Sequence, residues 1–396
     1  MHSGTANSSE TDSARPGSMV VAPFKHPILV TRPFLPPLNE YTDGLKEIWD
    51  SQWLTNNGRV LRRFTKSLSR ELDTDRLALF NNGTIALQLG LHSLAVTGEA
   101  VTSPFTFVAT THALSWNNVR PVFADIEPQF YTLDPRKVEA AITPSTTAIV
   151  AVHVYGHPCN LDALADIAKR HNLSLIYDAA HAFGVKVNGV SIAHYGDLNM
   201  FSFHATKLFH SIEGGMLTFS DPLLKSHLNY LKNFGFKNDV EVVLRGTNGK
   251  MNEMQALMGE MVLRYLPQIL SKRRTLYERY RARLGDVPGV KLVPTLPAEV
   301  SYNYSYMPVE IHEREFGLSR DGLYEALKLY NIFARRYFYP LTCDFACYRG
   351  LPGTDPLTVA RGVAARILTL PIYYDLSLRD VDKICDIIVQ IRNTNT

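Results

Sequence analysis

An alternation of short apolar runs with turns and amphipathic stretches, beginning at Leu77, limits this chain to few folds. The expected strands are residues 77–80, 101–103, 122–124, 148–152 and 173–177, and most of them precede a helical stretch. This alternation is typical of a mostly parallel sheet covered by helices. Of the 396 residues, 45% are hydrophobic and 20% charged, so the chain can bury the core of a soluble protein with two lobes.

Charge, hydropathy and cysteine usage exclude several classes of protein. A formal net charge of +3 gives no reason to expect nucleic acid or a membrane surface as partner. No run of eighteen apolar residues predicts a transmembrane helix, and the N-terminal residues do not resemble a secretory signal. The four cysteines, Cys159, Cys343, Cys347 and Cys385, form neither a disulfide framework nor a zinc pattern. We therefore expect a cytoplasmic protein with ordinary thiols and no metal.

Composition and periodicity divide the chain into three parts. Residues 1–24 are rich in small polar residues at their start, which predicts a disordered tail. We expect a large domain over residues 25–265 and a smaller α+β domain over residues 266–396. A Met-rich amphipathic helix, begun by Asn252 and Gln255 and kinked by Pro267, would connect them. In the small domain, residues 302–306 alternate as a strand does, and residues 378–391 are amphipathic.

Asp178 ends the apolar run 173–177. A continuous apolar run predicts a strand buried on both faces, and ligands of such sheets bind at the carboxyl ends of the strands. A buried carboxylate needs a partner for its charge, so Asp178 is a candidate ligand-binding residue. The alternative is that Asp178 only caps a following helix.

The stretch from Phe201 to Gly215 carries the most reactive candidate, Lys207. Phe201 and Phe203 alternate with polar residues as in a strand, and residues 216–220 would return antiparallel to it. An amine near apolar rings is poorly hydrated, which favours its neutral form, and a neutral amine attacks a carbonyl to form a Schiff base. The alternative is a surface lysine after a buried strand.

Together, a Schiff-base lysine and an aspartate that keeps a pyridine nitrogen protonated are the minimal equipment for pyridoxal 5′-phosphate (PLP). Gly83 and Thr84 open a helix and would bind its phosphate through free backbone N–H groups, unless they serve the helix start alone. Phe107 stacks on a flat ring or belongs to the core.

Two further segments are candidates for substrate contacts. The polar turn in residues 53–58, with Thr55 and Asn57, is either a connector or a loop that faces a ligand. The basic and aromatic segment 334–340 contains Arg335, Arg336 and Tyr337. The two arginine side chains either bind an anionic substrate group or lie solvated on the surface.

Four motifs in this order give the chain a family resemblance: Pro104-Phe-Thr-Phe, Asp178-Ala-Ala-His, Ser202-Phe-His-Ala-Thr-Lys, and Glu213-Gly-Gly. With them the chain resembles the DegT family of PLP-dependent nucleotide-sugar aminotransferases. The resemblance implies an α/β protein of PLP-dependent transferase fold type I, similar to aspartate aminotransferase. Its large domain would contain a mostly parallel seven-stranded sheet, followed by a smaller C-terminal domain.

The resemblance also implies roles for single residues. Lys207 would hold PLP and move the proton, Asp178 would pair with the pyridine nitrogen, and Phe107 would stack on the ring. His181 would lie near the ring hydroxyl. The residues implied to bind the phosphate are Gly83, Thr84 and Ser202.

Asn248 matches a family residue that reaches the phosphate of the neighbouring subunit, which implies a homodimer with shared active sites. Lys250 stands where the family often has arginine, so a role that depends on that arginine does not transfer directly.

The implied substrates are glutamate, as amino donor, and a nucleotide-linked keto-sugar. The stretch from Trp53 to Gly58 is similar to the branch that aminates C4 of dTDP-4-keto-6-deoxyglucose, in deoxyaminosugar pathways such as that of lipopolysaccharide O-antigen. The alternatives are amination at C3, a dehydration on the same scaffold, and a regulatory protein without catalysis. Family members that dehydrate carry histidine at the lysine position, and Lys207 favours transamination.

Overall fold

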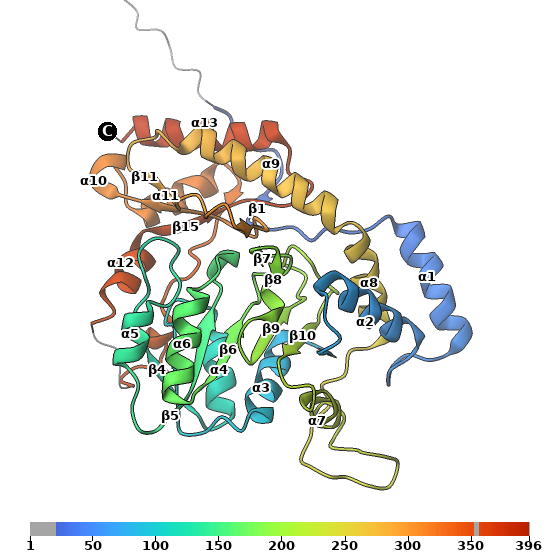
Figure 1. Ribbon diagram of the computed structural model, residues 1–396. Coiled ribbons are helices and arrows are strands. Elements are labelled where there is room, and N and C mark those ends of the chain that lie inside the picture. The colour runs from blue at the N-terminus through green and yellow to red at the C-terminus, as the bar shows by residue number, and fades with distance from the viewer. Residues whose placement is uncertain (1–20, 352–355, 396) are drawn as a thin grey trace, which may run out of the picture.

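The computed structural model describes residues 21–351 and 356–395, in which a large sheet is covered by helices on both faces (Figure 1). The expected seven-stranded sheet is confirmed, in the order β2-β10-β9-β6-β5-β3-β4. Its strands are β2 (Leu77–Phe80), β3 (Glu99–Thr102), β4 (Arg120–Phe123), β5 (Thr146–Val152), β6 (Ser174–Asp178), β9 (Leu198–Ser202) and β10 (Gly215–Phe219).

All neighbouring strands of this sheet are parallel except where β10 pairs with β2 and β9. Gly215 lies opposite Ser202 of β9 on one side and opposite Phe80 of β2 on the other. The antiparallel return expected after Phe201–Phe203 is therefore confirmed, with β10 reversing directly after the loop that contains Lys207.

Alternate residues of each strand enter separate apolar clusters, because side chains of a strand point to opposite faces. Leu77 and Leu79 of β2 belong to the cluster that also contains residues of helices α2 (Arg59–Leu72), α6 (Leu161–His171) and α8 (Glu253–Arg264). Ala78 and Phe80 pack on the other face with α3 (Gly83–Ser93), α4 (Val108–Trp116) and α7 (Leu224–Leu231). The short α5 (Pro135–Ala140) adds Val138 to the first cluster.

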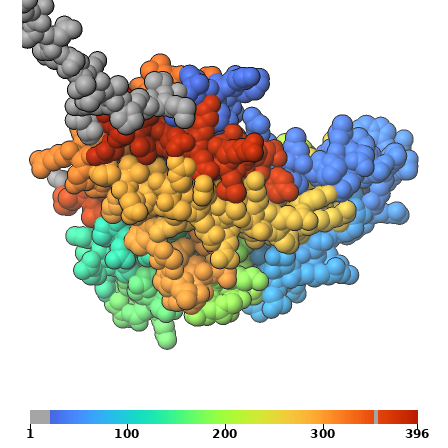
Figure 2. Space-filling view, turned by 90° about the horizontal axis from the view of Figure 1, so that it is seen from above, coloured from blue at the N-terminus to red at the C-terminus, as the bar shows by residue number. Residues whose placement is uncertain are grey.

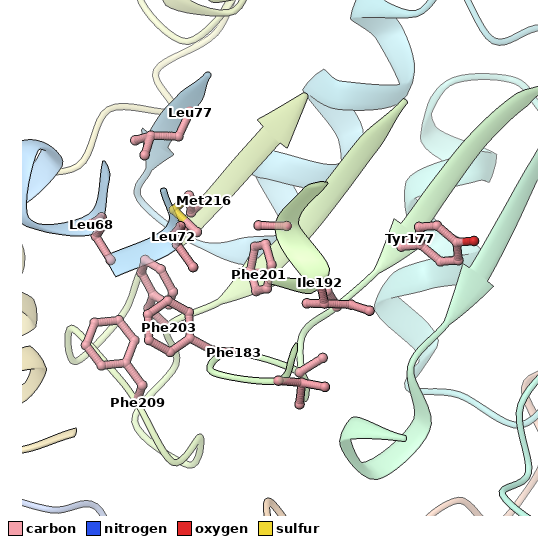
Figure 3. Packing of buried hydrophobic residues seen from close by; sticks show 14 of the residues in the cluster. Leu68, Leu72, Leu77, Tyr177, Phe183, Ile192, Phe201, Phe203, Phe209 and Met216 are labelled. Atoms are coloured by element: carbon pink, nitrogen blue, oxygen red, sulfur yellow. The ribbon is translucent and has the colours of Figure 1, made fainter. Parts of the chain in front are cut away.

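The first cluster is rich in aromatic rings below the end of β9 (Figure 3). Phe209 is stacked on Phe183 at 4.3 Å between ring centroids and meets Phe203 edge-on at 4.8 Å. Offset and edge-on ring pairs contribute about 0.5–1.5 kcal/mol each beyond their buried area. This packing fixes the chain on both sides of Lys207.

The connecting helix is present as two helices that meet at Tyr265. The capping box of Asn252 and Gln255 begins α8, and α9 (Leu266–Leu284) starts afresh with Pro267 in its first turn. α1 (Leu38–Ser51) and α2 pack on α8. The break that Pro267 predicts is therefore confirmed.

The C-terminal part contains the sheet β11-β13-β15, with β11 (Val290–Leu292), β13 (Met307–Ile311) and β15 (Ile367–Leu370). α9 and α13 (Leu378–Asn393) lie side by side on it, as Figure 2 shows from above. The remaining elements are β1 (Ile28–Leu29), β7 (Lys186–Val187), β8 (Val190–Ser191), β12 (Val300–Ser301), α10 (Glu313–Phe316), α11 (Arg320–Leu329), β14 (Ile332–Phe333) and α12 (Thr358–Arg366).

One local expectation was wrong and one boundary differs. Residues 302–306 are not a strand, because Tyr304 has φ +54° and Asn303 bonds to the chain that follows Asp178 instead. Of the expected tail 1–24, residues 1–20 lie outside the described residues, whereas Phe24 is buried in the C-terminal core.

Candidate active site

A cavity of about 280 Å³ lies at the carboxyl ends of the sheet strands. It collects the ends of β5, β6 and β9, the start of α3, the segment after β3, and three residues of the C-terminal part. The candidate residues that line it are Gly83, Thr84, Phe107, Asp178, His181, Ser202, Lys207, Arg335 and Tyr337. Residues from five separate segments of the sequence thus meet in one place.

Lys207 lies in the tight turn after β9, where its backbone N–H donates to the His204 carbonyl at 2.9 Å. The rings of Phe203 and Phe209 point into the apolar cluster beneath it (Figure 3). The Lys207 side chain itself is only partly buried, because it lines the open cavity. The expectation of a poorly hydrated amine stays a prediction.

Asp178 is 5% exposed and makes two hydrogen bonds through its carboxylate. The Thr110 hydroxyl donates to Oδ2 at 2.7 Å, and the Ala180 backbone N–H donates to Oδ1 at 3.1 Å. Burial raises the pKa of Asp178, while these two donors and the nearby Lys207 charge oppose the shift. The chain after Asp178 forms turns and no helix, so the helix-cap alternative was wrong.

The start of α3 offers backbone N–H groups to an anion. The Asn82 side chain caps the helix by accepting from the Ile85 N–H at 2.8 Å. A Cβ added to Gly83 would lie 3.2 Å from the Ser202 Cβ, and one added to Gly215 would lie 2.5 Å from the Asn82 carbonyl oxygen. Glycine at both positions lets β9, β10 and the helix start converge, which leaves a compact cradle for a phosphate.

His181 is held in one orientation and one tautomer. Its Nδ1 accepts from the Tyr155 backbone N–H at 3.2 Å, so the proton of the neutral ring is on Nε2. The ring lies parallel to that of Phe338, with 5.9 Å between centroids. Burial, with the Lys207 charge, lowers the pKa of His181 well below its ordinary value. A neutral imidazole that can donate from Nε2 suits a contact with a hydroxyl group.

Phe107 is 53% exposed at the start of α4. The interpretation as a core residue was therefore wrong, and its ring lines the cavity instead.

The neighbouring arginines 335 and 336 have different environments. Arg335 lies over the Tyr337 ring, 5.3 Å from its centroid, and both line the cavity. Arg336 pairs with Asp321 at 3.0 Å, away from the cavity lining. Of the two alternatives for this pair, the anion-binding one stays open for Arg335 alone.

Three candidates lie apart from this cavity within the chain. Every residue from Ser51 to Asn57 is exposed, including Thr55, and Asn57 lines a different cavity of about 440 Å³ with Lys232 and Lys250. Asn248 is exposed and accepts a hydrogen bond from Lys250 at 2.9 Å. These residues meet Lys207 only if another copy of the chain brings them there.

The sequence interpretation missed several cavity residues, namely Asn82, Thr106, His204, Thr206, Glu213 and Phe338, as well as Thr110 behind the cavity. Thr106 lies in the bend before α4 and Thr110 in the first turn of that helix, so their contact depends on how the chain enters the helix, which the sequence does not show. Glu213 pairs with His204 at 3.4 Å, which links two motifs that the sequence shows only separately.

Metal ligands and membrane spans were searched among the described residues. They contain no cluster of three or more His, Cys, Asp or Glu side chains able to hold a metal ion. Within residues 21–351 and 356–395, no helix combines the length and apolar character needed to cross a bilayer. All four cysteines are free.

The residues of this cavity fit PLP. The cradle at Gly83 suits the phosphate group of PLP, and the buried Asp178 carboxylate suits its cationic pyridine nitrogen. Lys207 provides the amine that the aldehyde group needs. A sheet of this order with such a cavity defines the class of PLP-dependent transferases.

Comparison with known proteins identifies the family. Residues 38–389 match the model of the DegT/DnrJ/EryC1/StrS aminotransferase family, and the chain belongs to this family. It is 43% identical over 369 residues to a dTDP-4-amino-4,6-dideoxy-D-glucose transaminase of Shigella dysenteriae, covering 93% of this chain and 100% of that protein. The Escherichia coli protein of that name is 41% identical over 367 residues, covering 91% and 98%.

Solved structures give the same result. The structure of DesI, determined in the presence of its TDP-sugar product, superposes with a TM-score of 0.89 at 37% identity and covers 94% of each chain. The aminotransferase TlmJ from Streptoalloteichus hindustanus superposes with a TM-score of 0.87 at 27% identity, covering 93% of this chain and 100% of TlmJ.

Proposed function

We propose that this protein transfers the amino group of glutamate to C4 of dTDP-4-keto-6-deoxyglucose, with PLP bound at Lys207. The observation that carries the proposal is that Lys207, Asp178 and the cradle at Gly83 line one cavity in a chain 41–43% identical to two dTDP-4-amino-4,6-dideoxy-D-glucose transaminases. The similarity to DesI, whose product is a TDP-sugar, supports a nucleotide-sugar acceptor.

PLP, when bound, supplies an electron sink that stabilises negative charge on the carbon losing its proton. Asp178 would supply the negative charge that keeps the ring nitrogen protonated, and the cradle of Gly83, Thr84 and Ser202 would hold the phosphate. Lys207 Nζ would take the proton from the α-carbon of the donor and pass it to the cofactor carbon.

The other residues orient substrate and cofactor. Phe107 would cover one face of the ring, and His181 would donate from Nε2 to the ring hydroxyl, since both line the cavity and Nδ1 of His181 already accepts from Tyr155. Arg335 and Tyr337 bind the carboxylate of the amino donor, since a guanidinium matches a carboxylate in charge and geometry.

We further propose a homodimer with shared sites, in which Asn248 reaches the cofactor phosphate of the partner and the loop with Thr55 and Asn57 contacts its sugar substrate. The segment between α7 and α8 supports this, because it exposes apolar side chains that a monomer would leave in water, namely Phe234, Phe236, Val240, Val242 and Val243. The domain boundary at residue 265/266 and a reducing cytoplasmic location also remain proposals, the latter consistent with four free cysteines.

The test is to load the purified protein with PLP and glutamate and to offer the aminated form a panel of nucleotide keto-sugars. We expect 2-oxoglutarate to form first, and dTDP-4-keto-6-deoxyglucose to receive the amine fastest. A preference for a 3-keto-sugar would change the proposed site of amination from C4 to C3. A protein that stays colourless with PLP and forms no 2-oxoglutarate would contradict the whole proposal and favour a regulatory role.

Shared sites have a separate test. Mixing inactive Lys207→Ala and Asn248→Ala proteins should restore part of the activity, because a hybrid dimer contains one site with both residues intact. No restoration in dimers shown to exchange subunits would contradict shared sites.

A further inference from the structure

A chain of two buried hydroxyl groups ends on the Asp178 carboxylate. Thr110 in α4 is 0% exposed, and its Oγ1 lies 2.7 Å from Asp178 Oδ2. An ionised carboxylate has no hydrogen to give, so the Thr110 hydroxyl is the donor of this bond. A hydrogen bond to a charged acceptor is about twice as strong as one between neutral groups.

The direction of the next bond follows from the first. Thr106 Oγ1 lies 2.9 Å from Thr110 Oγ1, and geometry alone allows either atom to donate. Because the single hydroxyl hydrogen of Thr110 points to Asp178, Thr106 donates to Thr110. The chain therefore runs from Thr106, at the cavity wall, through Thr110 to the carboxylate, and each bond polarises the next.

The two donors on Asp178 also fix the orientation of its carboxylate. Thr110 holds Oδ2 and the Ala180 N–H holds Oδ1, so that each oxygen has one bond inside the protein. The remaining lone pairs are available to the cavity that Asp178 lines. A carboxylate held by neutral donors keeps its negative charge for a cationic ligand.

We propose that Thr110 is a positioning residue that keeps Asp178 ionised and aimed at the ring nitrogen of the cofactor, with Thr106 as its outer donor. This inference rests on the proposed function, since it concerns PLP bound beside Asp178. The proposal assigns a role to a residue within α4, whereas the sequence indicated a role in this region only for Phe107, just before this helix.

The structure supplies a matched control on the same helix. Thr111 is also 0% exposed, and its hydroxyl has no hydrogen-bond partner within the described part of the chain. Thr111→Val therefore removes a buried hydroxyl without removing a bond to Asp178. Thr110→Val keeps the shape of the side chain and removes the donor, and Thr110→Ser restores the donor without the methyl group.

The experiment measures the dissociation constant of PLP and the visible absorbance band of the bound cofactor in the full-length protein and four variants. We expect Thr110→Val to weaken PLP binding about tenfold and to shift the band toward the form with an unprotonated ring. Thr106→Val should weaken binding about two- to threefold, since it acts through one intermediate bond. Thr110→Ser and Thr111→Val should match the wild type in both readouts.

The outcomes separate the two proposals. If the wild type binds PLP and Thr110→Val leaves affinity and band unchanged, the role of Thr110 is refuted and the proposed function stands. Equal losses in Thr110→Val and Thr111→Val, or no recovery in Thr110→Ser, would also refute it, because a packing defect would then explain the result. If the wild type itself binds no PLP, both proposals fail.

Discussion

Asp178 and Thr110, at the closed end of the cavity, are 5% and 0% exposed, whereas every residue of the loop from Ser51 to Asn57 is exposed. The closed end is built from strand ends, a helix start and an aromatic core, all of one chain. At the open end, Phe107 is 53% exposed and Arg335 and Tyr337 line the wall, but the loop from Ser51 to Asn57 could reach it only from another copy of the chain. The comparison predicts that the fold of one chain determines cofactor binding, and that loops at the edge determine substrate choice.

The largest effect separating the two ends should come from Lys207. Lys207→Ala removes the amine that moves the proton, and we expect the rate of 2-oxoglutarate formation to fall on the order of 10⁴-fold. Lys169→Ala, on the exposed face of α6, is the control and should not change the rate. Wild-type turnover in Lys207→Ala would place the chemistry elsewhere.

Asp178→Asn tests the negative charge at the closed end. The amide keeps the size of the side chain but cannot hold a ring nitrogen protonated, so we expect kcat to fall on the order of 10²-fold. The KM for the nucleotide sugar should stay near the wild-type value, since that substrate meets the open end. A change in KM alone would contradict the division between the two ends.

The arginine pair tests the open side of the cavity. Arg335→Ala should raise the KM for glutamate roughly tenfold or more, since a charge-assisted bond to a carboxylate contributes about 1.5–3 kcal/mol. Arg336→Ala loses a partly exposed ion pair with Asp321 and should leave that KM unchanged. Equal effects of both variants would show that the distinction drawn from their environments is mistaken.

Glu253 links the exposed loop to the core. Its carboxylate is 1% exposed and accepts from the backbone N–H groups of Gly58 at 3.0 Å and Val60 at 2.8 Å. Glu253→Gln replaces one of these carboxylate oxygens by an NH₂ group, which cannot accept a bond from a backbone N–H. We therefore expect the free energy of unfolding in urea to fall by about 1–3 kcal/mol. Glu71→Gln, exposed on α2, is the control, and an equal change in both would refute the role of Glu253.

The smallest effect concerns the stability of the cofactor-free protein. Burial raises the folded-state pKa of Asp178, so near neutral pH the buried charge lowers the stability of the folded protein. A neutral asparagine at this position would not carry this penalty. Asp178→Asn should raise the free energy of unfolding of the apoprotein by roughly 0.5–2 kcal/mol at pH 7. Since the protonated acid carries no charge, this gain should shrink as the pH falls through the folded-state pKa, and a gain that grows in acid would contradict the assignment.

Much of the closed end could be predicted from the sequence, because strand burial and strand ends leave periodic signals. The run 173–177 predicted a strand buried on both faces, and Asp178 does lie at its end in the cavity. The Gly83-Thr84 pair marked the helix start, which the structure places at Gly83. These inferences need only local patterns and the rule that parallel strands end at one edge.

Other features depend on contacts that no local pattern encodes. The cavity that Lys207 lines is built by residues from other segments, which the neighbouring phenylalanines do not reveal. Residues 302–306 alternate as a strand does, yet Asn303 donates to the carbonyls of His181 and Phe183, at 2.7 and 2.9 Å, and so supports the segment that carries His181 from behind the cavity. Arg335 and Arg336 are adjacent in sequence, and only the fold separates their partners.

The reversal of β10 has a consequence for anyone who wishes to redesign this protein. Gly215 is paired with both Phe80 and Ser202, so the loop carrying Lys207 is anchored at each end to the sheet, beside the phosphate cradle. A parallel strand in its place would need a crossover of a dozen or more residues, which would fix the position of Lys207 less firmly. Length changes between residues 203 and 214 would thus move the amine against the cradle, whereas grafts into residues 53–57 leave that spacing intact.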